Sequence, residues 1–162
     1  MEPEQPTPLL WTPREAQMRV ALRQARLAAE ADEVPIGAAI YQGDRLIAQA
    51  HNQVETLKDP TAHAEMIAIT QAASALGDWR LTDTVLYVTK EPCPMCAGAI
   101  VMARIPLVVW GVTDPQRGGA ISVFGIVQHP ALNHRACVFP GFLEEECKRI
   151  LVDFFRARRQ ES

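Results

Sequence analysis

The sequence of 162 residues predicts an α/β fold in which helices cover both faces of a mixed β-sheet. Segments with strand character alternate with helical segments along the chain, and no repeat, low-complexity tract or linker divides it. Hydrophobic residues make up 48% of the chain and charged residues 22%, which is ordinary for a globular domain with one buried core. We therefore expect one domain over residues 12–160, after a flexible N-terminal lead-in at residues 1–11.

A helix and a β-hairpin are expected at the start of this domain. The capping-box pattern Thr12-Pro13-Arg14-Glu15 predicts the start of the helix, with proline at its first position. Apolar residues then recur at helical spacing to about Glu30. Residues 36–41 and 45–50 flank Gln42-Gly43-Asp44, a pattern typical of two strands joined by a tight turn.

The middle of the chain predicts two more helices and two more strands. Thr61 is a candidate N-cap for a helix that runs to residue 76, where Gly77 ends it. The apolar segment 84–89 predicts a buried strand, and residues 93–104 predict a helix. Residues 107–110 predict a further strand.

The last part of the chain has a less regular pattern. Residues 111–143 contain short helical and extended pieces interrupted by glycine and proline, and they predict no long element. Residues 143–159 have the pattern of an amphipathic helix. The positions expected to face inward are Leu143, Cys147, Ile150, Leu151 and Phe154.

Composition narrows the functional classes. No apolar run approaches the roughly 18 residues that cross a bilayer, and the acidic, proline-rich start MEPEQPTPLLWTP is unlike a signal peptide. We therefore expect a cytoplasmic protein with no membrane partner. In such a protein the four cysteines predict metal ligands or buried thiols before disulfides. Cys137 and Cys147, which form no second C-x-x-C, are expected to be small core residues.

The charges of the chain give two opposing indications about nucleic-acid binding. The formal net charge is −3, which does not favour a nucleic-acid binder. The C-terminal segment is locally basic, however, with Arg156, Arg158 and Arg159 beside two phenylalanines. These arginines are either a solvated helix end, where cations favour the helix dipole, or possible RNA contacts that bind phosphates.

The most informative residues lie at the starts of two predicted helices, in His63-Ala64-Glu65 and Pro92-Cys93-Pro94-Met95-Cys96. One imidazole and two thiolates supply three ligands to Zn²⁺ and leave the fourth position open for water, as in catalytic zinc sites. A helix N-terminus also favours the thiolate form of cysteine. We therefore predict His63, Cys93 and Cys96 as the ligands of one zinc ion.

Glu65 follows His63 by two residues, a spacing that does not place both side chains on one helix face. Glu65 is therefore poorly placed as a fourth ligand. It can still reach a water held on the zinc, whose pKa the metal lowers to about 7. We predict that Glu65 is the catalytic residue that takes this proton and passes it to a ring nitrogen and to the departing amine. The combined pattern matches the signature of zinc-dependent nucleobase deaminases.

Other interpretations of these motifs stay open at this point. C-x-x-C alone can be a redox pair, although no strand and active loop of the thioredoxin kind precede Cys93. The cysteines can also belong to a structural four-ligand zinc site or to a non-catalytic, zinc-stabilised binding module. The carboxylate of Glu65 argues against both, because a purely structural site has no use for it.

Several longer segments extend the pattern over residues 13–160. They are Glu33-Val34-Pro35-Ile36-Gly37, Asp59-Pro60-Thr61-Ala62-His63-Ala64-Glu65-Met66, Leu76-Gly77-Asp78-Trp79-Arg80-Leu81, Leu86-Tyr87-Val88-Thr89, Glu91-Pro92-Cys93-Pro94-Met95-Cys96-Ala97-Gly98-Ala99, Asn133-His134-Arg135, Leu143-Glu144-Glu145-Glu146-Cys147 and Phe154-Phe155-Arg156. Together they resemble the bacterial tRNA-specific adenosine deaminases of the cytidine deaminase superfamily. The resemblance implies a three-layer α/β/α sandwich around a mixed five-stranded sheet. It also implies a homodimer with one zinc ion per subunit, which converts adenosine to inosine at the wobble position of a tRNA anticodon stem-loop.

The resemblance also implies a set of substrate-binding residues. Asn52 matches an asparagine that hydrogen-bonds the flipped base, and the backbone N–H of Ala64 would hold the base edge. Ile36 and Pro92 would form pocket walls. Asp114 matches an aspartate that contacts the RNA near the target nucleotide. By residue type alone, Asn52 is also an ordinary turn former, and Asp114 is a helix cap before the following proline.

Two positions depart from the family pattern where substrate discrimination is expected. Lys90 stands where a leucine usually precedes Glu-Pro-Cys, which places a charge near the pocket mouth. Residues 120–126 read AISVFGI, where the family usually has a small segment with glycine and serine. These departures and the acidic net charge favour an alternative function, in which the same zinc site deaminates a free nucleobase or nucleoside (guanine, cytosine or adenosine).

Overall fold

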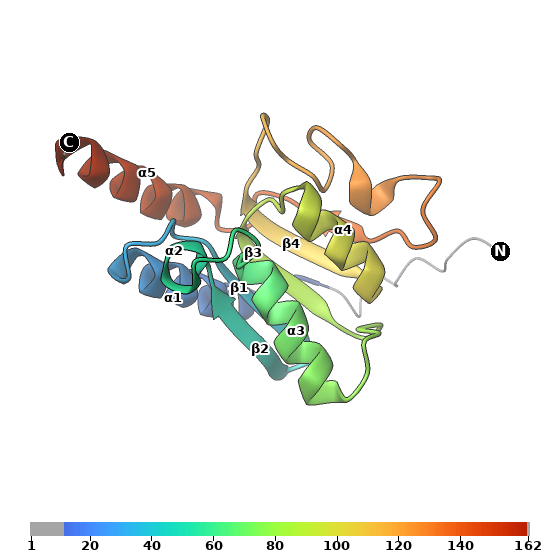
Figure 1. Ribbon diagram of the computed structural model, residues 1–162. Helices are drawn as coiled ribbons and strands as arrows, with labels where there is room; N and C mark the ends of the chain where they lie inside the picture. The colour runs from blue at the N-terminus through green and yellow to red at the C-terminus, as the bar shows by residue number, and fades with distance from the viewer. Residues whose placement is uncertain (1–11, 162) are drawn as a thin grey trace.

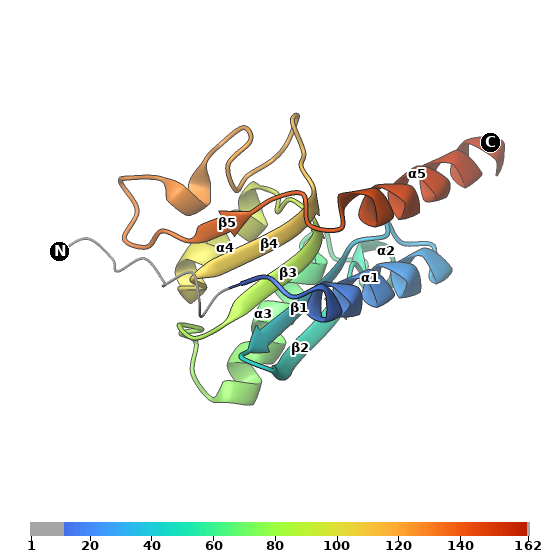
Figure 2. The ribbon, with the colours of Figure 1, turned by 180° about the vertical axis from the view of Figure 1, so that it is seen from behind.

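The computed structural model describes residues 12–161, which form a five-stranded sheet between two layers of helices (Figures 1 and 2). The predicted lead-in, residues 1–11, lies outside the described part of the chain. In chain order, the elements are α1 (Glu15–Glu30), β1 (Gly37–Gln42), β2 (Arg45–His51), α2 (Val54–Leu57), α3 (Ala64–Leu76), β3 (Val85–Lys90), α4 (Pro94–Ala103), β4 (Leu107–Val112), the 3-10 helix η1 (Ile126–Gln128), β5 (Cys137–Phe139) and α5 (Glu144–Glu161).

The strand order in the sheet is β2-β1-β3-β4-β5. Strand β1 is antiparallel to both of its neighbours, β2 and β3, whereas β3, β4 and β5 are parallel to one another. A parallel pair needs a crossover connection, and α4 supplies it between β3 and β4. The predicted three-layer fold around a mixed five-stranded sheet is thus confirmed.

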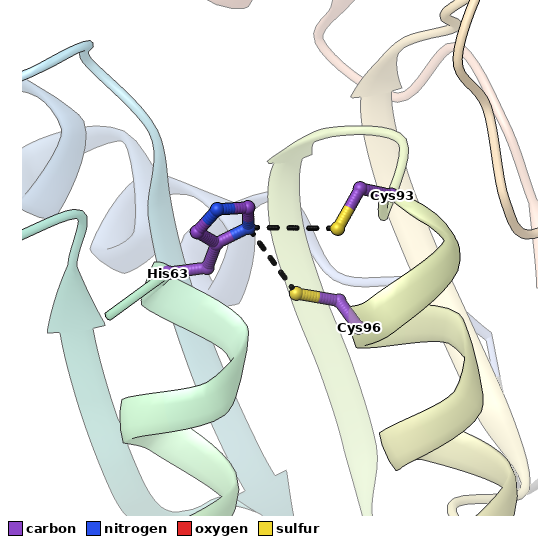
Figure 3. Close-up of side chains that lie close together, drawn as sticks. All are labelled: His63, Cys93 and Cys96. Carbon is purple, nitrogen blue, oxygen red and sulfur yellow. Dashed lines mark hydrogen bonds between the residues drawn. The ribbon is translucent and has the colours of Figure 1, made fainter. Parts of the chain in front are cut away.

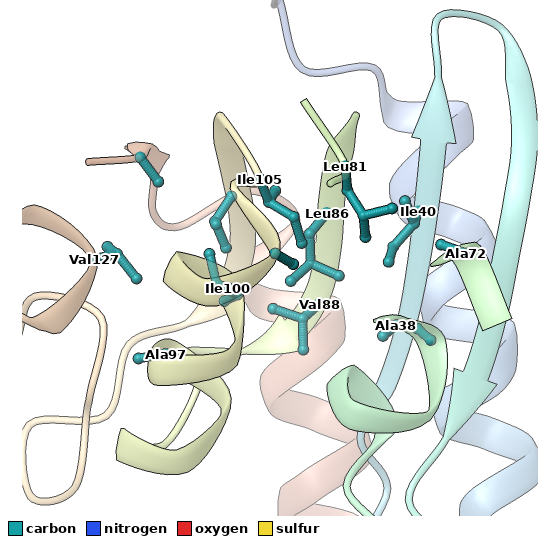
Figure 4. Packing of buried hydrophobic residues seen from close by; sticks show 14 of the residues in the cluster. Ala38, Ile40, Ala72, Leu81, Leu86, Val88, Ala97, Ile100, Ile105 and Val127 are labelled. Atoms are coloured by element: carbon teal, nitrogen blue, oxygen red, sulfur yellow. The ribbon is translucent and has the colours of Figure 1, made fainter. Parts of the chain in front are cut away.

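The two faces of the sheet form two cores. On one face, α3, α4 and η1 cover a cluster that includes Leu86 and Val88 (Figure 4). On the other face, α1 and the start of α5 cover a second cluster that includes Tyr87 (Figure 2). Successive residues of β3 therefore point to opposite layers, as expected of a strand buried on both sides. None of the described helices is both long and apolar enough to cross a membrane.

The predicted capping box at the first helix is wrong. Helix α1 begins at Glu15, and its N-cap residue is Arg14, whose own side chain makes no capping hydrogen bond. The backbone N–H of Arg14 donates a hydrogen bond to the hydroxyl of Tyr87 at 3.1 Å. This contact with β3 fixes the entry of the chain into the helix, so the start is set by packing against the sheet and not by Thr12.

The start of α3 also differs from the prediction. Thr61 does not cap this helix, because its N–H and its hydroxyl both donate to the carboxylate of Asp59, at 2.8 and 2.7 Å. The N-cap residue is His63, two positions later. The predicted end of the helix is confirmed, since Gly77 is the C-cap and takes the left-handed conformation that glycine tolerates (φ +68°).

The segment that the sequence left undefined contains η1 and the short strand β5, which pairs with β4. All four cysteines lie in the described part of the chain and none is in a disulfide; Cys147 is buried and Cys137 is partly exposed. In α5, Cys147 and Leu151 are buried. The other positions predicted to face inward are half-buried, namely Leu143, Ile150 and Phe154.

Candidate active site

Helices α3 and α4 bring a histidine and two cysteines together at their N-terminal ends (Figure 3). His63 is the N-cap residue of α3, Cys93 is the N-cap residue of α4, and Cys96 lies in the first turn of α4. The Nδ1 atom of His63 lies 3.5 Å from Sγ of Cys93 and 3.6 Å from Sγ of Cys96. All three donor atoms lie within 4.8 Å of one another, so the group can hold a metal ion.

A cavity of about 310 Å³ lies beside this ligand group. His63 and Cys93 line the cavity, whereas Cys96 is fully buried behind them. Glu65 lines it as well and is not part of the ligand group. The ligand group is therefore open to the cavity at His63 and Cys93, and a small substrate can reach it there.

The two cysteines of the ligand group differ in protonation. A hydrogen bond with Cys96, followed by one with His63, holds the pKa of Cys93 down to about 4 despite partial burial. The same hydrogen bond and the burial of Cys96 raise the pKa of that second thiol. The hydrogen bond with Cys93 also raises the pKa of His63. The lowered pKa of Cys93 favours its thiolate, the form that binds metal, and metal binding would release the protons that remain on the group.

Glu65 is a buried acid in the first turn of α3, with an exposed fraction of 4%. Burial raises its pKa, and the nearby Cys93 raises it further. A carboxyl whose pKa is raised holds a proton more readily than an exposed carboxyl does. Its position beside the ligand group therefore suits proton transfer.

The predicted substrate-binding residues are only partly assembled around the cavity. Asn52, Ala64 and Ile36 line it. Asn52 also bridges two backbone segments, since its side chain donates to the carbonyl of Val34 and accepts from the N–H of Val54, both at 3.3 Å. Pro92 is buried and is not among the lining residues.

Asp114 lies at the cavity and caps the turn that follows it. One carboxylate oxygen accepts the N–H groups of Gln116 and Arg117, each at 3.0 Å. The other oxygen lies 3.3 Å from the ammonium of Lys90. Burial acts to raise the pKa of Asp114, but these backbone hydrogen bonds and Lys90 lower it overall. The capping role expected from the residue type is thus present, in addition to a position on the cavity wall.

The three predicted RNA-contacting arginines of α5 differ in the hollows that they line. Arg158 reaches the cavity wall, where it donates to the carbonyl of Asp32 and stacks over the ring of Phe154 at 4.7 Å. Arg156 lines a separate hollow on the same helix. Arg159 is exposed near the end of α5 and lines neither of these hollows.

Glu91, directly after β3, organises a loop of the site and was not predicted as a site residue. Its exposed fraction is only 4%. Its carboxylate accepts the N–H of Asp114 at 3.1 Å and the N–H groups of Ile121 and Ser122 at 3.0 Å, together with the Ser122 hydroxyl. A buried carboxylate is costly unless it is hydrogen-bonded in this way. The sequence signal is an acid at the end of a buried strand, where it needs protein partners.

Glu33, on another part of the cavity wall, likewise holds a segment of the site through hydrogen bonds, and it was also not predicted as a site residue. It is 1% exposed and accepts the N–H groups of Glu55 and Thr56 at 3.0 and 2.7 Å, and the Thr56 hydroxyl at 2.7 Å. Burial acts to raise the pKa of Glu33, but the hydrogen bonds outweigh it and the pKa is lowered. The ionised carboxylate thus holds α2 against the cavity.

The loop that Glu91 organises packs directly on the backbone of Cys93. The N–H of Gly119 donates to the carbonyl of Pro92 at 2.8 Å. A Cβ at Gly119 would lie 2.5 Å from the carbonyl carbon of Cys93 and from the nitrogen of Pro94. Backbone atoms cannot rotate away as a side chain can, so glycine alone fits. The loop therefore restrains the turn that presents Cys93.

Two comparisons in sequence place the chain among known proteins. The family model of MafB19-like deaminases matches residues 13–159. The tRNA-specific adenosine deaminase of Bacillus subtilis (strain 168) is 47% identical over 149 residues, which is 92% of each chain. The protein of the same description from Aquifex aeolicus (strain VF5) is 46% identical over 142 residues, or 88% of this chain and 93% of the other.

Solved structures show the same fold. A chain from a study of A-to-I editing by tRNA:A34 deaminases at the wobble position of transfer RNA has a TM-score of 0.82 and 44% identity, over 85% of this chain and 100% of that one. Guanine deaminase from Bacillus subtilis is more distant, with a TM-score of 0.61 and 31% identity over 92% of this chain and 95% of that one.

Replacing Gly119 with alanine tests the packing of the loop on Cys93. The added methyl would overlap the backbone, so we expect the free energy of unfolding to fall by about 1–3 kcal/mol. Gly98→Ala is the matched control, because nothing lies within 4 Å of its added Cβ and alanine favours a helix. Chemical denaturation measures both variants, and equal stability of the two would show that the close contact is unimportant.

Proposed function

This chain belongs to the tRNA-specific adenosine deaminases, and on that premise we propose that it converts adenosine to inosine at the wobble position of a tRNA anticodon stem-loop. The observation that carries the proposal is the convergence of His63, Cys93 and Cys96 with the buried acid Glu65 on one cavity. The adenosine substrate is supported by the 47% identity with a named adenosine deaminase over almost the entire chain.

We propose one zinc ion per subunit, held by His63, Cys93 and Cys96. The donor set of one imidazole and two thiolates is that of zinc, and three protein ligands are typical of a catalytic site. Glu65 is not one of the three residues of the ligand group, which fits a catalytic site better than a structural one filled by four ligands. When bound, zinc supplies the Lewis acidity that lowers the pKa of a water molecule to about 7.

Glu65 is the proposed proton carrier of the reaction. Its carboxylate takes one proton from the attacking water and delivers it to a ring nitrogen of the base. It then takes the second proton from the oxygen added to the ring carbon and delivers it to the departing amine. Adenosine and water thereby give inosine and ammonia. The raised pKa of Glu65 helps the second half of this transfer, because a weaker acid holds the proton until the amine is ready to leave.

The walls of the cavity hold the base in the proposed complex. The amide of Asn52 hydrogen-bonds the base, and the backbone N–H of Ala64, at the first residue of α3, has no partner within its own helix. Ile36 supplies an apolar wall. A base in an anticodon loop is already partly unstacked, so the cost of moving it into such a cavity is small.

Removing the carboxylate of Glu65 tests its role. We expect Glu65→Ala to keep its zinc and its fold, because the ligand group does not include this residue. Deamination should fall by at least the roughly 10²–10⁴-fold typical of a general acid–base group. Metal analysis and single-turnover kinetics measure the two properties. Near-normal turnover in this variant would refute the assignment.

Removing a thiolate tests the metal ligands. We expect Cys93→Ser and Cys96→Ser each to lose zinc, because the site would retain only two of its soft or borderline donors. Cys137→Ser is the control. Cys137 lies in β5 outside the ligand group, so this variant should keep its full zinc content. Full zinc occupancy in both ligand variants would exclude the proposed set.

The substrate is tested by inosine formation in an adenosine-bearing anticodon stem-loop, beside free adenosine, cytidine and guanine. We expect inosine in the stem-loop, and we expect its binding to weaken as salt rises, because lysine and arginine contacts with phosphates release counterions. Turnover of guanine alone would favour the second candidate function, which is deamination of a free nucleobase. The likeness to a guanine deaminase supports that candidate. The departures at Lys90 and residues 120–126 would then account for the change of substrate.

Assembly and location stay predictions that rest on the family resemblance. We propose a homodimer that acts in the cytoplasm, where a tRNA substrate is available. Exposed apolar side chains on α4 and on the loop that follows β4, such as Met102 at 72% and Phe124 at 54%, are consistent with a partner surface.

A further inference from the structure

Lys90 places a positive charge at the cavity that the proposed reaction does not use. It is the last residue of β3, and its ammonium lies 3.3 Å from the carboxylate of Asp114. The side chain of Lys90 is 34% exposed, whereas that of Asp114 is 14% exposed. Both line the same cavity as His63 and Glu65. The ion pair is therefore a part of the cavity wall that solvent can reach.

Three of the acidic side chains that line this cavity are already hydrogen-bonded within the protein. Glu33 and Glu91 accept backbone N–H groups on opposite sides of the cavity. Asp114 accepts two backbone N–H groups in addition to its contact with Lys90. These carboxylates are thus occupied by donors from the protein itself, apart from the one oxygen that faces Lys90.

The cationic groups of the wall are more available. Arg117 is exposed, follows Asp114 in the same loop, and lines the cavity. Arg158 reaches the wall from α5. Lys90 lies with them on the wall, so three cations from three separate elements border one cavity. A phosphate beside these three side chains would meet positive charge locally, although the exposed acids Asp32 and Glu55 also line the cavity and the chain as a whole has a net charge of −3.

We propose that Lys90 binds a phosphodiester group that flanks the target nucleotide, and that it exchanges its ion pair with Asp114 for this contact. The proposal rests on the proposed function and names the part of the substrate that the site recognises. A cavity of about 310 Å³ holds a base but not a polynucleotide. The sugar and the neighbouring phosphates must therefore remain outside, beside the wall that carries Lys90.

The exchange costs little, for two reasons. A partly exposed ion pair contributes only about 0–1 kcal/mol, and Asp114 keeps its two backbone hydrogen bonds after Lys90 leaves. A phosphate contact in turn releases a counterion from the nucleic acid. Lys90 therefore acts as a specificity-determining residue, since a free base has no phosphate to bind.

The test measures the affinity of the zinc-loaded Glu65→Ala protein for the anticodon stem-loop as a function of salt. We expect Lys90→Leu to weaken binding at low salt and to flatten the plot of log affinity against log salt by about 0.7 to 1. Lys90→Arg, which keeps the charge, should restore the slope. Asp114→Asn, which keeps Lys90, should not flatten it. An unchanged slope in Lys90→Leu would overturn the inference.

A second measurement removes the charge from the RNA. A stem-loop with a neutral methylphosphonate beside the target nucleotide should bind more weakly than the natural one when Lys90 is present, and equally when leucine replaces it. The same penalty in both proteins would overturn the inference.

The two proposals fail in different ways. If the protein with intact Glu65 and Lys90 forms no inosine in the stem-loop, the proposed function fails, and this inference fails with it. If inosine forms and Lys90→Leu retains the full salt slope, the proposed function stands and only the role of Lys90 is refuted.

Discussion

The candidate active site depends on the side-by-side packing of α3 and α4 with their N-termini at the same end of the sheet (Figures 1 and 3). His63 and Cys93 are the N-cap residues of these helices, so their positions follow from where the helices begin. The apolar core beneath, with Leu86 and Val88 of β3, fixes both helices on one face. A slip of one helical turn, about 5.4 Å, would separate donor atoms that lie within 4.8 Å of one another.

Two buried carboxylates extend this arrangement from the ligands to the walls of the cavity. Glu91 holds the loop after β4, and Glu33 holds α2. Each carboxylate gives up its hydration and accepts hydrogen bonds from backbone N–H groups. These bonds make the loop or the short helix rigid without much apolar burial of its own. Gly119 then brings the Glu91 loop against the backbone of Cys93. The metal ligands and the surroundings of the substrate are therefore parts of one hydrogen-bonded structure.

The same carboxylates explain how an acidic protein can border its cavity with cations. The net charge of −3 counts every acid equally, but Glu33 and Glu91 are almost fully buried and already accept hydrogen bonds from the backbone. Lys90, Arg117 and Arg158 retain exposed surface. Charge on the cavity wall is thus unevenly spread, with exposed acids such as Asp32 and Glu55 beside these cations, and the local distribution acts on a ligand within a Debye length of about 8–10 Å.

The sequence by itself determined the fold class, the family and the donor residues, because these depend on periodicity and on residue types at short spacing. The helix end at Gly77 belongs to this class. Other features depended on contacts between distant segments. Thr61 is hydrogen-bonded to Asp59 and does not take its predicted capping role. Strand β5 exists through its pairing with β4. The hydrogen-bond donors around Glu91 come from residues 23 to 31 positions away. A local sequence pattern reflects the propensity and the chemistry of neighbouring residues. The hydrogen-bond partner of a buried polar group depends instead on how distant segments pack, so only the tertiary structure decided that partner.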